Sequence, residues 1–181
     1  MTSPLDPPEG NWWDVPVNRR EATWLGIAGV WSLGIFAWMS GFTWFGDQNP
    51  VGETYKVTPE EFREMVQEYK DEAEQTDDGL IPPGDSVYIA GQRFGWDGLP
   101  VVLEVDREYD LHLGAYDVQH GFSVRPEHAL SKQINLQIFP DTEWVVPMTF
   151  EETGTYHVIC NEFCGAGHNS MHGRFIVREQ S

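Results

Sequence analysis

Two cysteines, a histidine and a methionine lie close together near the end of the chain, in the stretch CNEFCGAGHNSM. They are Cys160, Cys164, His168 and Met171, and no other cysteine occurs in the protein. Thiolate, imidazole and thioether groups form a soft ligand set that selects copper, or zinc if the thioether takes no part. A disulfide between the cysteines is the alternative, although closing so small a loop adds little stability. The stretch therefore predicts a metal site.

The two cysteines also bear on how many ions the site holds. A single-copper electron-transfer site takes one cysteine, two histidines and a weakly bound methionine. Here two cysteines could each bridge, which favours a pair of copper ions over one. Each ion then needs its own nitrogen ligand. His168 supplies one, so a second histidine must come from elsewhere in the fold.

Five other histidines could supply the second nitrogen. We predict His120, because it follows a strand-like segment and precedes Gly121, with Asp117 three positions earlier. The remaining four occupy a strand surface, a polar loop, a strand interior and the position directly after the methionine: His112, His128, His157 and His172.

The segments that must hold this loop have the pattern of short β-strands. From residue 86 onward, seven β-type runs are separated by turn residues: SVYIAG, PVVLEV, YDLHLGA, INLQIF, EWVVPMTF, TYHVIC and GRFIVR. This spacing predicts an antiparallel sandwich or barrel. The last two runs flank the cysteine loop, so two strands would hold it. No glycine-rich phosphate loop or serine elbow appears, and the chemistry must therefore come from loops.

An uncharged segment, WLGIAGVWSLGIFAWMSGFTWF, runs from Trp24 to Phe45. At about 1.5 Å per residue it spans roughly 33 Å, enough for a hydrocarbon core of about 30 Å. A signal peptide usually has a shorter apolar core, of about 7–15 residues, and a core helix of this length would be hard to bury. Arg19 and Arg20 precede the segment. We therefore expect a single span in the plasma membrane, with the N-terminus cytoplasmic and the C-terminal part outside.

The remaining segments form a tail and a linker. Residues 1–23 are expected to be a cytoplasmic tail, rich at its start in Pro, Gly and acidic residues. Residues 46–85 connect the span to the β domain at 86–181. They contain a capping-box start at Thr58 and Glu61, which predicts a short helix. Its apolar residues recur at helical spacing: Phe62, Met65, Val66 and Tyr69. A simple linking helix is the plain interpretation, and a partner-binding helix is the alternative.

The net charge of −18 is extreme for 181 residues. It argues against nucleic-acid binding, because a phosphate backbone repels such a surface. Two interpretations compete: a docking face for a basic protein donor, and a surface adapted to concentrated salt. At about 1 M salt the Debye length falls to roughly 3 Å, so dense like charge becomes tolerable. The acidic residues are spread along the chain, which favours the salt interpretation.

The two metal-binding stretches together resemble the CuA site of cytochrome c oxidase subunit II. The family pattern is a histidine, then Cys-x-Glu-x-Cys-Gly-x-x-His-x-x-Met, and DVQHGFSV with CNEFCGAGHNSM matches each named position. The resemblance covers about 86–180 and implies an all-β, cupredoxin-like Greek-key sandwich or barrel with one N-terminal transmembrane helix and a short linker helix. It implies two copper ions bridged by both cysteines, with Glu162 binding through its backbone carbonyl. The implied ligands are His120, Cys160, Glu162, Cys164, His168 and Met171.

The resemblance also implies partners. Subunit II receives electrons from an external cytochrome c or blue-copper donor and delivers them to haem in subunit I, where oxygen is reduced to water. The chain would thus belong to an oxidoreductase of the respiratory chain without being catalytic in isolation. A single span resembles the B-type haem–copper oxidases. In family members that carry the acid at Glu162, its side chain reaches a magnesium ion at the subunit I interface, although some single-span forms lack that acid.

Three further residues have roles suggested by their positions. Phe94 and Trp96, in GQRFGWDGLP, resemble the aromatic loop that faces the electron donor in this family, and core packing is the alternative for each ring. Asp117 is a candidate for holding the His120 segment, and an ordinary turn acid is the alternative.

Two other functions stay open at the level of sequence. The chain could be the CuA subunit of a nitric oxide or nitrous oxide reductase, although nitrous oxide reductases carry this domain on a much longer chain with a catalytic domain. It could also be a membrane-tethered copper carrier or chaperone, which exposed and flexible ligands would favour.

Overall fold

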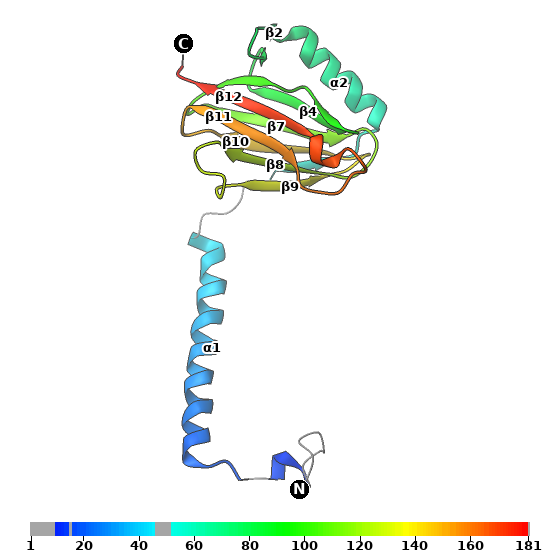
Figure 1. The fold of residues 1–181 in the computed structure, drawn as a ribbon. Helices are drawn as coiled ribbons and strands as arrows, with labels where there is room; N and C mark the ends of the chain where they lie inside the picture. The colour runs from blue at the N-terminus through cyan, green and yellow to red at the C-terminus, as the bar shows by residue number, and fades with distance from the viewer. Residues whose placement is uncertain (1–9, 15, 46–51, 181) are drawn as a thin grey trace. The chain divides into compact units, whose positions relative to one another are not determined.

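The computed structural model describes residues 10–14, 16–45 and 52–180 (Figure 1). The predicted tail and the start of the predicted linker therefore lie partly outside the described residues. The chain divides into two compact units, Met1–Gln48 and Asn49–Ser181.

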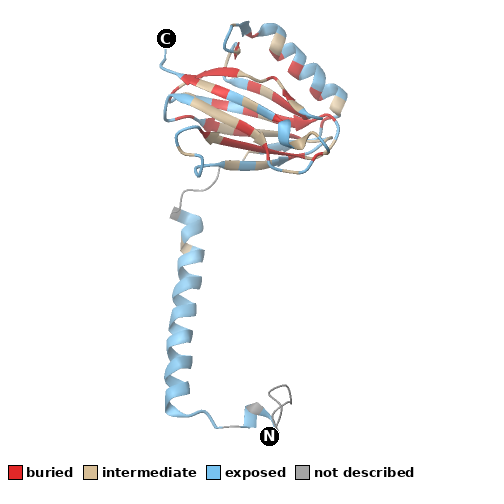
Figure 2. Cartoon of the chain, viewed as in Figure 1, coloured by how far each residue is buried: buried red, intermediate tan, exposed pale blue. Residues whose placement is uncertain are grey.

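The first unit holds a 3-10 turn, η1 (Trp12–Asp14), and one long helix, α1 (Arg19–Phe45). The helix begins before the apolar segment because Asn18 caps it: its side-chain oxygen accepts the backbone N–H groups of Arg20 and Glu21, each at 3.0 Å. Its residues are exposed almost throughout (Figure 2). With a mean hydropathy of 1.5 over its apolar window, α1 is long and apolar enough to cross a membrane.

The second unit is a β-sandwich, as predicted. One sheet has five strands, in the order β1 (Glu53–Tyr55), β10 (Glu143–Thr149), β7 (Glu108–Ala115), β4 (Ser86–Gln92) and β5 (Gly95–Asp97). The other has seven, in the order β2 (Glu74–Gln75), β3 (Leu80–Ile81), β6 (Val101–Glu104), β12 (His172–Arg178), β11 (Gly154–Cys160), β8 (His120–Pro126) and β9 (Ile134–Ile138).

The pairing is mixed rather than wholly antiparallel. β4 pairs with β7, and β6 with both β3 and β12, in parallel. These parallel neighbours are not consecutive in the chain, because the polypeptide crosses between the sheets before it returns. The antiparallel prediction is therefore wrong for these pairs and right for the others.

The sandwich core lies between the two sheets. Fully buried side chains from both sheets meet there: Ile89, Leu111, Leu113, Phe122 and Phe175 (Figure 2). Burying each such side chain contributes on the order of 1.5–3 kcal/mol. Phe122 packs edge-on against Trp96, with ring centroids 5.4 Å apart, so the core reaches the end of β8 at which His120 begins the strand.

Residues 53–81 belong to the folded unit, although the sequence analysis assigned them to a linker. β1 pairs with β10, and α2 (Pro59–Glu72) lies on the outer face of the five-stranded sheet (Figure 1). The predicted capping box of α2 is present. Phe62 packs on Gly114, where an added Cβ would lie 2.6 Å from its ring. Phe62, Val66 and Tyr69 of the predicted apolar face are thus buried within the chain, whereas Met65 is exposed, so the partner-binding alternative loses most of that face.

Candidate metal centre

Four sulfur and nitrogen contacts join five side chains at one end of the sandwich. The Sγ atoms of Cys160 and Cys164 are 3.9 Å apart. His120 Nδ1 lies 3.8 Å from Cys160 Sγ, and His168 Nδ1 lies 3.8 Å from Cys164 Sγ. Met171 Sδ lies 4.0 Å from Cys164 Sγ. The structure therefore brings together every predicted side-chain ligand.

Neighbouring strands of the seven-stranded sheet position these side chains. Cys160 ends β11 and pairs with Phe122 of β8, so β8 carries His120 to the same end of the sheet. Met171 directly precedes β12, and its carbonyl accepts the N–H of Cys160 at 3.3 Å. Between them, the short helix η2 (His168–Ser170) turns the chain back. Three adjacent strands thus fix the donors relative to one another.

The sequence predicted that His120 follows a strand, whereas in the structure His120 lies within one. It is the first residue of β8, and its side chain is completely buried. The strand was not predicted because its sequence, HGFSVRP, carries glycine and proline near its two ends and only two β-type residues, Phe122 and Val124.

The distances fit a shared metal ion. A thiolate binds a metal such as zinc at about 2.3 Å, so two sulfurs that share an ion are at most about 4.6 Å apart. An imidazole nitrogen at about 2.0 Å and a sulfur on the same ion are likewise at most about 4.3 Å apart. The observed separations satisfy both limits. Cys160 and Cys164 are free cysteines, and their sulfurs are too far apart for a disulfide.

Burial makes negative charge on the cysteines of the site energetically costly. It raises the pKa of the Cys164 thiol, and the neighbouring Cys160 raises it further. Two adjacent buried cysteines can therefore both become thiolates only beside positive charge, which a metal ion would supply. The carbonyl oxygen of Glu162 lies 3.1 Å from Cys160 Sγ, so this backbone oxygen also faces the donor group, as predicted for Glu162.

Asp117 fixes the orientation of the His120 ring. Its Oδ1 atom lies 2.9 Å from His120 Nε2, and the carboxylate also accepts the backbone N–H groups of Val118 and Arg93. Burial opposes ionisation of Asp117, but these hydrogen bonds prevail and hold its pKa below the usual value. An ionised carboxylate can only accept hydrogen bonds, so Nε2 carries the proton and Nδ1 is free to bind a metal.

Comparison with known proteins gives the relatives of this chain. No protein-family model matches the chain. Two curated relatives from Thermus thermophilus, each called cytochrome c oxidase subunit 2, are 33% identical to it over 94 residues, or 52% of this chain. The chain is similar to cytochrome c oxidase subunit II. The match spans 66% of one relative and 53% of the other, slightly under two thirds and about half of their lengths.

Solved structures agree with this relationship. A chain of a haem–copper terminal oxidase dimer, studied by cryo-electron microscopy, matches with 25% identity and a TM-score of 0.57, covering 88% of this chain and all of that one. Rusticyanin from Thiobacillus ferrooxidans matches at 16% identity with a TM-score of 0.50, covering 72% of this chain and all of its own. The rusticyanin match shows the fold alone, which is cupredoxin-like, as predicted.

The two residues predicted as electron-input candidates differ in position. Trp96 is 9% exposed, and its ring lies 6.3 Å from that of His120. Phe94 is 39% exposed and covers the metal loop, since a Cβ added at Gly167 would lie 2.5 Å from its ring. Phe94 thus meets solvent, whereas Trp96 belongs to the core beside His120.

Phe163 is a residue of the site that the sequence analysis missed. It lies between the cysteines, is 76% exposed and has its ring 5.9 Å from that of His168. The sequence did contain one signal for it. An exposed loop usually carries polar residues, yet Phe163 is aromatic and lies between two ligand positions.

The histidines that were set aside have other contacts. His112 was predicted to lie on a strand surface, but it is partly buried: Nδ1 lies 2.6 Å from the buried carboxylate of Glu143, and its ring stacks on Tyr88 at 4.1 Å. His172 Nε2 contacts the carbonyl of Asn169. His128 contacts Glu152 at 2.9 Å.

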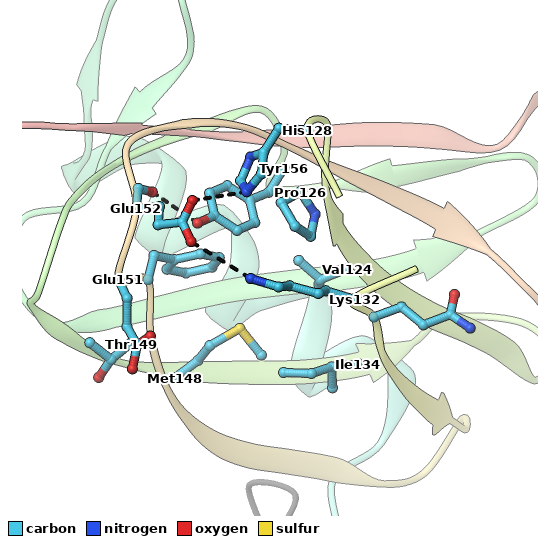
Figure 3. Close-up of a pocket in the computed structure, with 12 residues that line it drawn as sticks. Val124, Pro126, His128, Lys132, Ile134, Met148, Thr149, Glu151, Glu152 and Tyr156 are labelled. Atoms are coloured by element: carbon cyan, nitrogen blue, oxygen red, sulfur yellow. Dashed lines mark hydrogen bonds and ion pairs between the residues drawn. The ribbon is translucent and has the colours of Figure 1, made fainter. Parts of the chain in front are cut away.

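His128 lines a cavity of about 410 Å³ at the end of β8 opposite to His120 (Figure 3). Its lining includes the apolar side chains of Val124, Met148 and Phe150. The Glu152 carboxylate contacts both His128 and Lys132. The cavity is therefore separate from the metal centre.

Proposed function

We propose that this chain is the electron-input subunit of a haem–copper terminal oxidase. It takes electrons from an external cytochrome c or blue-copper protein and delivers them to haem in subunit I, for the reduction of oxygen to water. The observation that carries the proposal is the convergence of two cysteine sulfurs, two imidazoles and one thioether, of which only the His168 imidazole is partly exposed. The relationship to subunit II and to a haem–copper oxidase chain supports it.

The donor set suits a pair of copper ions. Cys160 and Cys164 would hold both ions, because their sulfurs lie 3.9 Å apart. His120 and His168 are the terminal nitrogen ligands, one beside each sulfur. Met171 provides the weak sulfur ligand. When bound, the copper pair accepts and releases one electron at a time.

The protein contributes rigidity and exclusion of water. His120 and Met171 are completely buried, and both cysteines are nearly so. Strand pairing between β8, β11 and β12 limits movement of the ligands. Asp117 holds the His120 ring in one tautomer. A site that cannot rearrange suits electron transfer, because little structural change accompanies each change of charge.

The surroundings suggest how the subunit meets its partners. Phe94, which packs on the metal loop, and Phe163, which lies within it, are exposed aromatic side chains, and an exposed aromatic ring suits contact with a protein partner. Trp96 lies inside, next to His120, and can connect the surface to the centre. The Glu162 side chain is a candidate ligand for magnesium at the interface with subunit I.

The anchor completes the proposal. α1 crosses the plasma membrane once, and Arg19 and Arg20 place its N-terminal end in the cytoplasm. The sandwich is then outside the cytoplasm, where a soluble donor protein can reach the metal loop.

The deciding experiment is electron paramagnetic resonance of the full chain in detergent after copper loading, with the copper-to-protein ratio measured on the same sample. Hyperfine structure from one electron shared between two copper nuclei, at two ions per chain, is the expected result. A single-copper spectrum at one ion per chain would contradict the binuclear centre.

Two experiments separate the alternatives. Co-purification with a haem subunit that reduces nitric or nitrous oxide, and not oxygen, would favour a nitrogen-oxide reductase. Rapid transfer of copper to a chelator would favour a copper carrier. The burial of the ligands makes rapid transfer unexpected.

A further inference from the structure

Arg93, in the turn between β4 and β5, makes hydrogen bonds on both the cysteine side and the histidine side of the metal centre. Its guanidinium Nε donates a hydrogen bond to the carbonyl oxygen of Cys164 at 3.0 Å. Its backbone N–H donates to Asp117 Oδ2, also at 3.0 Å. Asp117 in turn holds His120. One residue from the opposite sheet is therefore linked to a cysteine ligand directly and to a histidine ligand through a single carboxylate.

The neighbouring residue strengthens this contact. The ring of Phe94 lies on Gly165 and Gly167, where an added Cβ would be 3.0 Å and 2.5 Å from ring atoms. Arg93 and Phe94 thus cover the segment that follows Cys164 from the outside. No side chain can be added to these glycines without moving the ring, so the turn and the metal loop fit closely.

We propose that Arg93 is a positioning residue that holds the metal loop and raises the reduction potential of the centre through its positive charge. The inference rests on the proposed function, because it assumes that the site holds redox-active copper. The residue acts through the Cys164 peptide and Asp117 and does not itself bind metal.

The direction of the effect follows from charge. Reduction adds one electron to the centre, and a fixed cation nearby stabilises the reduced state more than the oxidised state. The hydrogen bond to the Cys164 carbonyl also draws electron density away from the ligand's own peptide group. Both effects favour reduction. Because the Arg93 side chain is exposed, the charge effect should weaken as salt screens it.

Arg93 is a positively charged residue in a strongly acidic protein. The chain carries 29 acidic residues against 11 lysines and arginines, so the general field of the protein opposes the addition of an electron. A guanidinium held against the metal loop offsets that field locally.

The test compares Arg93→Gln, which removes the charge, with Arg93→Lys, which keeps it. Arg178→Gln is the matched control, because Arg178 lies at the end of β12 away from the metal loop. Each full-length variant is loaded with copper in detergent. Its reduction potential is then measured by redox titration at low and high salt, together with its paramagnetic resonance spectrum.

We expect Arg93→Gln to lower the equilibrium constant for one-electron reduction, and each tenfold fall corresponds to about 59 mV for a one-electron couple. The difference should shrink at high salt. Arg93→Lys should stay close to the unmodified protein, and Arg178→Gln should not differ from it. An unchanged potential in Arg93→Gln, with an unaltered spectrum, would overturn the proposal.

The two proposals can fail separately. A one-copper spectrum in the unmodified protein would contradict the binuclear centre, while the potential of that single centre would still report on Arg93. If Arg93→Gln binds no copper, the reduction potential of Arg93→Lys decides whether the charge acts on the centre. A potential that varies with salt as in the unmodified protein supports the proposal. A potential that does not vary with salt overturns the proposal.

Discussion

Nε2 of His120 lies 2.9 Å from Oδ1 of Asp117, while Nδ1 of the same ring lies 3.8 Å from the sulfur of Cys160. The carboxylate and the sulfur thus lie on opposite sides of one completely buried imidazole. The ring cannot turn over without losing both contacts. Asp117 therefore determines which nitrogen is offered to the metal.

Replacing Asp117 by Asn should weaken copper binding by about 10- to 100-fold, the usual effect of removing a hydrogen-bond partner from a metal-binding histidine. The amide can present its NH₂ group to Nε2 and favour the wrong tautomer. Competition with a chelator of known affinity measures the loss. Asp110→Asn, an exposed change on β7, is the control, and equal affinities for the two variants would contradict the role of Asp117.

Met171→Leu should keep copper but raise its reduction potential. Leucine nearly conserves the volume of this completely buried side chain, so the loss of stability should stay below about 1.5 kcal/mol. Removing the weak thioether donor destabilises the oxidised state more than the reduced state. Redox titration measures the shift. Met148→Leu, the same change in a buried residue of the distant cavity, should leave the potential unchanged; a shift there would show that the effect is not local.

Gly114→Ala should destabilise the β domain by about 1–3 kcal/mol, the usual cost of overpacking. The added methyl would lie 2.6 Å from the Phe62 ring and push α2 away from the sheet. Chemical unfolding followed by tryptophan fluorescence measures the loss. Gly84→Ala is the control, because nothing lies within 4 Å of a Cβ at that position. A neutral Gly114→Ala variant would mean that α2 is held more loosely than the structure shows.

Thr58→Ala should cost about 1 kcal/mol of unfolding free energy, as expected for the loss of a helix cap. Thr58→Ser keeps the hydroxyl and should be nearly neutral. Hydrogen bonds from the Thr58 backbone and hydroxyl lower the pKa of Glu61. The contribution of Glu61 is therefore present above the ordinary glutamate pKa and is lost as the pH falls through the lowered value.

Unfolding of both Thr58 variants at neutral and at acidic pH provides the check. The difference between Thr58→Ala and the unmodified protein should narrow in acid, because protonated Glu61 no longer completes the capping box. A difference that does not change with pH would assign the stabilisation to the Thr58 hydroxyl alone.

The sequence predicted the parts of this fold whose residues alternate or repeat. Most half-exposed strands, the α2 cap and the apolar helix all have local patterns that indicate their structure. β8 escaped prediction because Gly121 and Pro126 near its ends read as turn residues and leave only Phe122 and Val124 as β-type residues. The ligand motif, by contrast, could be predicted because metal binding restricts both the residue types of the ligands and their spacing.

Contacts between distant segments could not be predicted. Arg93 and Cys164 are 71 residues apart in the chain, and only the folded β4–β5 turn places one against the other. The pairing of His112 with Glu143 also depends on the β7–β10 register, so an apparently polar strand position became partly buried.

The placement of the ligands on three neighbouring strands gives copper a mechanical role as well. β8, β11 and β12 lie side by side, and an ion held by His120, Cys160 and Met171 joins all three at one end. A bound ion would resist separation of the strands at that end, whereas the protein's own packing holds the strands together at the opposite end. Copper release should therefore open the sandwich locally, and amide hydrogens of these three strands nearest the metal loop should be the first to exchange.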